Sequence, residues 1–302
     1  MVRHTEPTLE QGLQIGPYHV DQLEVTTRFS RIARATHVET GDSVALKLPA
    51  GPNSQRVLQN ELVIYRCLAG IESSRIVRMH GSGIWRDAPY IATEWQQNGT
   101  LREVLPMPLG IAKQNKRTSQ PSNPQVFWDN LRIVADGAAG LAELHEQGFI
   151  HCDVKPDNIA IGDNNTGKLL DFGVALSADD APYAIESGVF GTPGQSIPPE
   201  AYLDGNTTSP TRDAWAMAAT AFRALSGVMV FGEPRSLDPI GYRSQVNRRP
   251  PLALRDLHPS APSDLDRIIT EALDPDPKKR PSVSEMRDVF NQAANQDRVS
   301  DH

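Results

Sequence analysis

The stretch HCDVKPDNIAIGDNNTGKLLDFG, residues 151–173, decides how the rest of the chain is interpreted. It contains two short apolar runs, NIAI and KLL, each beside polar residues that can carry chemistry. Asp153, Lys155 and Asn158 accompany the first run, and Asp171 follows the second. Carboxylate and amide oxygens are ligands that magnesium prefers, and phosphoryl transfer requires charge neutralisation and a positioned nucleophile. The stretch therefore places a cation and oxygen ligands for magnesium close together in the sequence.

Two charged residues before this stretch fit the same chemistry. Lys47 ends the short apolar run VALK, and Glu61 lies in a segment, residues 54–70, whose apolar spacing predicts a helix. Lys47 offers a cation to the α- and β-phosphates of a nucleotide. A lysine on a strand needs an anion to hold it, and Glu61 is the candidate.

The order VALK, Glu61, HCDVKPDN and DFG, with DFG thirteen residues after Asn158, resembles the eukaryotic-type protein kinase family and its serine/threonine branch. The resemblance spans about residues 18–290. It implies an α+β, two-lobed kinase fold with a small antiparallel-sheet N-lobe carrying one helix and a larger, mainly helical C-lobe. It also implies transfer of the γ-phosphate of ATP, with Mg²⁺, to a Ser or Thr hydroxyl of a protein substrate.

The resemblance assigns a role to each residue of the opening stretch. Asp153 is implied to accept the proton of the substrate hydroxyl or to orient it, and Lys155 to neutralise the transferring phosphate. Asn158 and Asp171 are the implied metal ligands. These assignments follow from the match between motifs, because an isolated aspartate in a loop is usually a turn former or a cap.

Further positions are implied to bind ATP or to support the fold. Thr93 matches the gatekeeper position, and the backbones of Glu94 and Gln96 would face adenine, while Val25 and Ile32 flank the phosphate loop. The residues implied to shape the activation segment and its supports are Thr192, Glu200, Asp213 and Arg280. Glu200 and Arg280 are expected to form a buried ion pair, and Asp213 to cap the backbone of the catalytic loop.

The chain departs from the family pattern in three places. Val25, Thr27 and Ser30 stand where the phosphate loop normally has glycines, which predicts weakened or altered ATP binding. Cys152 replaces the arginine that receives an activation-segment phosphate, so we expect activity to be independent of that switch. Residues 195–196 replace a usual tyrosine and add one residue, so the sequence does not predict the shape of the peptide-binding surface.

Composition excludes several other classes of protein. The net charge is −7, which argues against a broad basic surface for nucleic acid or anionic lipid. Arg223 interrupts the most apolar stretch, residues 214–231, so we expect a buried helix and no membrane span. Cys67 and Cys152 form no metal-ligand pattern, and the N-terminus lacks a signal-peptide core. We expect a cytoplasmic location, with a nuclear one left open, while the oligomeric state is unassigned.

The pattern of apolar residues divides the chain into four parts. Alternation predicts strands over 43–49 and 88–95, with a hairpin turn over 39–42, and an amphipathic helix over 127–148. The expected organisation is an N-terminal tail over 1–17, an N-lobe over 18–95, a C-lobe over 96–290 with an exposed insertion over 106–125, and a C-terminal tail over 291–302.

Two alternatives to a protein kinase remain. A pseudokinase acting as a nucleotide-binding or scaffolding module is favoured by the missing glycines and disfavoured by the complete set of catalytic residues. A kinase acting on a small molecule is disfavoured by the peptide-type elements VFGTPG and PPE.

Overall fold

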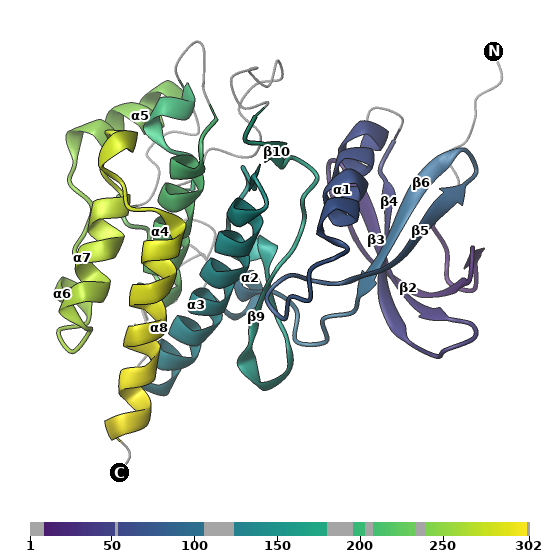
Figure 1. The fold of residues 1–302 in the computed structure, drawn as a ribbon, viewed down its shortest axis with the longest axis horizontal. Helices are drawn as coiled ribbons and strands as arrows, with labels where there is room; N and C mark the ends of the chain where they lie inside the picture. The colour runs from purple at the N-terminus through teal and green to yellow at the C-terminus, as the bar shows by residue number, and fades with distance from the viewer. Residues whose placement is uncertain are drawn as a thin grey trace, which may run out of the picture. The chain divides into compact units, whose positions relative to one another are not determined.

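A computed structural model of the chain describes residues 9–51, 54–105, 124–179, 196–202, 208–232 and 239–300. The chain forms two compact units: the first comprises Met1–Gln97 and Asp171–Ala175, and the second Asn98–Leu170 and Leu176–His302. The first is built on an antiparallel sheet and the second mainly on helices (Figure 1). The predicted α+β class is confirmed.

The first unit contains a six-stranded sheet whose neighbouring strands are all antiparallel, in the order β1-β2-β3-β4-β6-β5. The strands are β1 (Gln14–Ile15), β2 (Tyr18–Thr26), β3 (Ser30–His37), β4 (Ser43–Pro49), β5 (Met79–Trp85) and β6 (Ala88–Glu94). In β4, Val44, Leu46 and Leu48 are buried in the sheet's core. Successive side chains alternate across a strand, so Lys47 leaves from the opposite face.

The expected turn over residues 39–42 joins β3 to β4. Its backbone closes through a hydrogen bond from the His37 amide to the Asp42 carbonyl at 2.9 Å. The Thr40 hydroxyl donates to the Asp42 carboxylate at 2.7 Å, and Gly41 adopts a φ of +76°, which glycine tolerates without strain. This turn sets the register that places Lys47 opposite Ile32.

Among the described residues of the first unit, one helix, α1 (Gln55–Leu68), packs against β4 and β6 (Figure 1). Leu58, Ile64, Tyr65 and Leu68 make its buried face. Glu61 lies on that same face and is buried as well. A carboxylate in this position needs a partner, because burying an unpaired charge is strongly unfavourable.

Part of the expected N-terminal tail belongs to the sheet. Leu9 and Ile15 are buried in the same core as Tyr18 and Val20, and Ile15 lies in β1. Polar composition predicts a loose tail, but a few apolar residues are enough to anchor an edge strand when the sheet offers a core. Residues 1–8 of that tail lie outside the described residues.

The second unit is organised around the long helix α3 (Pro124–Glu146), which packs against α4 (Pro210–Ser226) and α8 (Val283–Ser300) (Figure 1). The other α-helices are α2 (Leu101–Val104), α5 (Pro239–Arg248), α6 (Leu254–Leu257) and α7 (Ser263–Ala272). Two short antiparallel pairs complete it: β7 (Phe149–Ile150) with β10 (Leu176–Ser177), and β8 (Ile159–Ile161) with β9 (Gly167–Leu169). Of the expected insertion 106–125, residues 106–123 lie outside the description.

Helix α4 is the buried helix expected within residues 214–231. Trp215 and Phe222 are fully buried, and Gly227 ends the helix with a φ of +74°. No helix within the described ranges is long and apolar enough to cross a membrane.

Residues 291–300, which we expected to be a tail, continue α8. Phe290, Ala293 and Ala294 are buried, so the apolar stripe that begins at Val283 and Met286 extends into this segment. A helix persists as long as its apolar face has a partner, and α3 provides one here.

Candidate active site

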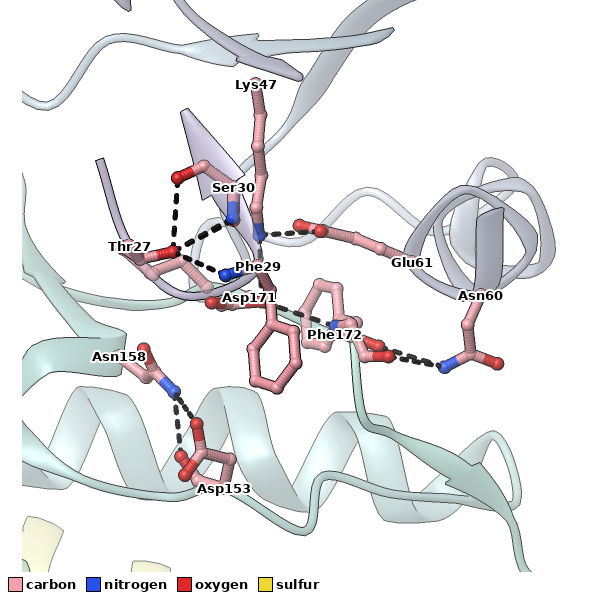
Figure 2. A network of polar contacts seen from close by, with 12 residues as sticks. Thr27, Phe29, Ser30, Lys47, Asn60, Glu61, Asp153, Asn158, Asp171 and Phe172 are labelled. Atoms are coloured by element: carbon pink, nitrogen blue, oxygen red, sulfur yellow. Dashed lines mark hydrogen bonds and ion pairs between the residues drawn. The ribbon is translucent and has the colours of Figure 1, made fainter. Parts of the chain in front are cut away.

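A buried ion-pair network in the first unit joins Lys47, Glu61 and Asp171 (Figure 2). The Lys47 Nζ lies 2.7 Å from Oε2 of Glu61 and 2.9 Å from Oδ1 of Asp171. The side chains of Lys47 and Glu61 are 11% and 3% exposed, whereas that of Asp171 is 37% exposed. The ammonium is therefore held on one side by a buried anion and reaches a more accessible carboxylate on the other.

Burial and the neighbouring opposite charges shift the pKa values of Lys47 and Glu61 in opposite directions. Burial alone would lower the pKa of Lys47, but the carboxylates of Asp171 and Glu61 outweigh it and raise that pKa above its ordinary value. Burial raises the pKa of Glu61 to about 7, against the opposing attraction of Lys47. The lysine thus stays protonated, and the carboxylate of Glu61 titrates near neutrality.

Two side chains of α1, those of Asn60 and Tyr65, hold the short segment Asp171–Ala175 in place. The side-chain amide of Asn60 donates to the carbonyl oxygens of Phe172 at 3.3 Å, Gly173 at 3.1 Å and Ala175 at 2.8 Å. The fully buried ring of Phe172 packs edge-on against Tyr65, with ring centroids 5.1 Å apart. Figure 2 shows Asn60 reaching this segment beside Glu61.

Asn60 is a functional candidate that sequence reasoning missed. The only feature of the sequence that could have pointed to Asn60 is its position next to Glu61, on a helix with a predicted buried face. Asp171, the residue that this segment presents, has a φ of +67°, a left-handed conformation uncommon outside glycine. A strained backbone conformation persists where several surrounding contacts hold it in place, and Asn60 supplies three such contacts.

The second unit brings together Asp153, Lys155 and Asn158, on the loop between β7 and β8. The Lys155 ammonium lies 2.6 Å from Oδ2 of Asp153. The Asn158 side-chain amide donates to the Asp153 carbonyl at 2.8 Å and to its Oδ2 at 3.1 Å. Both carboxylate and backbone of Asp153 are thereby fixed, as Figure 2 shows for Asn158. Such a carboxylate is positioned to orient a hydroxyl.

Each unit offers one side-chain oxygen of the kind that magnesium prefers. The Nδ2 of Asn158 is engaged with Asp153, and no described residue donates to its amide oxygen, the atom that magnesium prefers. Asp171 offers a partly exposed carboxylate. Within the described part of the chain, no cluster of three or more His, Cys, Asp or Glu side chains forms a metal site.

Asp213 fixes the backbone of the catalytic loop from α4. Its Oδ2 accepts from the His151 amide at 2.7 Å, and its Oδ1 accepts from the Cys152 amide at 2.9 Å. Nε2 of His145 lies 2.8 Å from Oδ2. Burial alone would raise the pKa of Asp213, but the hydrogen bond with His145 and the neighbouring histidine charges lower it. The carboxylate therefore stays ionised while buried.

Cys152 is buried, and its backbone has a φ of +66°. Burial, with the nearby Asp213 carboxylate, raises the pKa of its thiol well above the ordinary value. Because the thiolate is the reactive species, this cysteine is chemically quiet. It fits a small replacement for arginine better than a redox sensor.

Glu200 and Arg280 form a bidentate ion pair in the second unit, at 2.6 and 2.8 Å. The Arg280 side chain is fully buried, donates also to the Asp274 carbonyl at 2.8 Å, and lies over the ring of Trp215 at 4.9 Å. Removing one partner from such a pair leaves a buried charge uncompensated and typically destabilises a protein by about 3–5 kcal/mol. Thr192, the fourth residue expected in this region, lies outside the described residues.

The positions expected to contact adenine and the phosphate loop are on β2, β3 and the end of β6. Val25 faces Ile32 across the β2–β3 ladder, and Val25 is 45% exposed. The Glu94 amide donates to the Arg78 carbonyl at 2.9 Å, and its carboxylate accepts from the Arg78 amide at 2.9 Å. Gln96 follows β6 and is partly buried.

Comparison with known proteins points to one family. Residues 26–290 match the family model described as "Protein kinase domain". A serine/threonine-protein kinase PknB of Mycobacterium leprae is 31% identical over 66% of this chain and 29% of its own length. The PknB of Mycobacterium tuberculosis is 28% identical with the same coverage, and the PknL of that species is 28% identical over 74% of this chain and 52% of its own. The chain thus spans less than a third of either PknB.

Proposed function

Because this chain belongs to the protein kinase family, as its motifs predicted, we propose that it transfers the γ-phosphate of ATP to a serine or threonine hydroxyl of a protein. The observation that carries this proposal is the completeness of the two networks. Lys47, Glu61 and Asp171 form one, and Asp153, Lys155 and Asn158 form the other. These six residues are all of the types that phosphoryl transfer needs, although the glycines of the phosphate loop are replaced.

Each side chain has a defined task in this proposal. Lys47, kept charged and fixed by Glu61, binds the α- and β-phosphates. Asp153 orients the substrate hydroxyl and takes its proton, while Lys155 balances charge on the transferring group. Asn158 and Asp171 would hold Mg²⁺, which when bound neutralises charge that develops on the phosphate oxygens.

The ion pair between Lys155 and Asp153 supports these roles. At 2.6 Å, the ammonium holds the carboxylate in one orientation, and the Lys155 side chain as a whole remains 35% exposed. A lysine so placed can bind an incoming phosphate without moving far. The substrates of PknB and PknL are not assigned to this chain, because it aligns with them at only 28–31% identity and spans 29–52% of their length.

The decisive experiment is a phosphotransfer assay. Purified protein is incubated with magnesium, γ-labelled ATP and a general basic protein that offers Ser and Thr. The variant Asp153→Asn keeps the shape and loses the charge, and we expect the rate to fall by about 10²–10⁴-fold. Asp157→Asn is the matched control, because it makes the same change at an exposed position in the same loop and should retain activity.

Label transfer by the native protein and by Asp157→Asn, but not by Asp153→Asn, would support a working kinase. Equal, background-level transfer by all three folded proteins would overturn the proposal. In that case nucleotide binding, measured calorimetrically, would assign the chain to the pseudokinase alternative.

A further inference from the structure

The hydroxyl of Thr27 closes the glycine-free loop between β2 and β3. Its Oγ1 accepts hydrogen bonds from two successive backbone amides, those of Phe29 at 3.2 Å and Ser30 at 3.0 Å. The hydroxyl proton is directed to the Ser30 carbonyl at 3.2 Å. Figure 2 shows both amides pointing at this one oxygen.

Two successive amides that converge on one oxygen are the arrangement by which protein backbones bind anions. In the family pattern, the loop at this place covers the phosphates of ATP. In this chain the amides of Phe29 and Ser30 already have an acceptor, and it comes from the residue at a glycine position. A glycine at position 27 would leave both amides available to a ligand.

We propose that the Thr27 hydroxyl is a built-in competitor for a nucleotide phosphate oxygen, which rests on the proposed binding of ATP. The hydroxyl occupies in the free protein the donors that a phosphate needs. Charge-assisted hydrogen bonds are stronger than neutral ones, so a phosphate displaces the hydroxyl. Part of the free energy gained from the phosphate contact is lost because the hydrogen bonds from the two amides to the Thr27 hydroxyl must break. Thr27 therefore sets the affinity for the phosphate part of the nucleotide.

The opposite role, in which Thr27 preorganises the loop for ATP, is less consistent with the backbone contacts. The Thr27 amide donates to the Ser30 carbonyl at 2.7 Å, and the Ala50 amide donates to the Phe29 carbonyl at 3.0 Å. These two bonds fix the tip of the hairpin without any side chain. Removing the hydroxyl should release the two amides and leave the turn formed.

The test uses three substitutions with graded chemistry. Thr27→Val removes the hydroxyl and keeps the shape, Thr27→Ser keeps the hydroxyl, and Thr27→Gly restores the family residue. Thr26→Val is the matched control, since it makes the same change at the neighbouring exposed position, where no described residue bonds the side-chain hydroxyl. Dissociation constants for ATP and AMP with magnesium are measured by calorimetry, beside KM and kcat.

We expect Thr27→Val to bind ATP about 3- to 10-fold more tightly and to lower KM for ATP similarly, with kcat little changed. Thr27→Ser and Thr26→Val should match the native protein. Affinity for AMP, which lacks the β- and γ-phosphates, should not change in any variant. A gain confined to ATP is a readout that a general change in stability would not produce.

Unchanged or weaker ATP binding by Thr27→Val would overturn the inference, as would an equal gain for AMP. If no form of the protein binds nucleotide, both the inference and the proposed function fail. If Thr27→Val binds ATP more tightly but no form transfers phosphate, the inference stands and the proposed catalysis fails.

Discussion

At Glu61, one carboxyl group decides whether Lys47 has a buried partner. Burial raises the pKa of Glu61 to about 7, whereas the carboxylate must be ionised to hold the ammonium at 2.7 Å. A carboxyl group is mostly ionised above its pKa and mostly protonated below it. Protonation of Glu61 below pH 7 therefore weakens its ion pair with Lys47. Lys47 itself stays charged throughout this range.

We predict that kcat/KM for ATP rises with pH through a transition near pH 7. Below the transition, the slope should approach about tenfold per pH unit, as expected for one ionising group. The residual activity of Glu61→Gln, measured over the same range, should lack this transition because its amide does not titrate. A transition that persists unchanged in Glu61→Gln would assign it to another group.

At the scale of a secondary-structure element, α1 does more than cover the sheet. It carries Glu61 toward Lys47, Asn60 toward three carbonyl oxygens of the segment 171–175, and Tyr65 against Phe172. A methyl group on Gly173 would lie 2.6 Å from a side-chain carbon of Val57, so the helix and this segment are in close contact. The helix and the strained Asp171 are thus coupled through several independent contacts.

We predict that Asn60→Asp lowers the free energy of unfolding by about 1–3 kcal/mol, because a donor amide becomes an acceptor facing three carbonyls. It should also lower kcat and increase amide hydrogen exchange at Ala175, whose amide bonds the Phe172 carbonyl at 3.1 Å. Gln59→Glu is the matched control: the same amide-to-carboxylate change, one residue away and exposed. It should change stability by no more than about 0.5 kcal/mol. Equal effects of the two substitutions would refute the role of Asn60.

Periodicity predicted several of the helices and strands, and residue order singled out the residues of the candidate site. The helix around Glu61 and the strand that ends with VALK each follow from repeating apolar positions. Asn60 and Thr27 could not be found this way, because each bonds backbone groups brought near by the fold or by a local turn. The expected tails differ from the structure for a related reason: Leu9 and Ala293 are buried only because a sheet and α3 provide surfaces for them.

At the scale of the whole molecule, Cys152 bears on how the protein is controlled. The catalytic loop is fixed by Asp213, through the amides of His151 and Cys152, and α1 fixes the segment around Asp171. Neither contact uses a phosphate group. A neutral, buried thiol at position 152 cannot replace the cationic side chain that would bind an activation-segment phosphate.

We predict that phosphatase treatment leaves the activity of this protein unchanged. The measurement compares kcat/KM of the protein as purified with that of phosphatase-treated protein, with mass spectrometry to confirm that phosphate was removed. Cys152→Arg, given the same treatment, tests whether a cation at this position introduces sensitivity to phosphate. A large loss of native activity after dephosphorylation would be incompatible with this prediction.

The assignment of Asp171–Ala175 to the first unit has a practical consequence for anyone who divides this gene. The polypeptide passes from one unit to the other after Gln97, again after Leu170 and once more after Ala175. No single cut therefore yields two intact pieces. A fragment ending at Gln97 would leave Lys47 without Asp171 and Tyr65 without the ring of Phe172, and a fragment starting at Asn98 would carry that ring away from its partner. Truncation libraries and split reporters should treat the chain as indivisible.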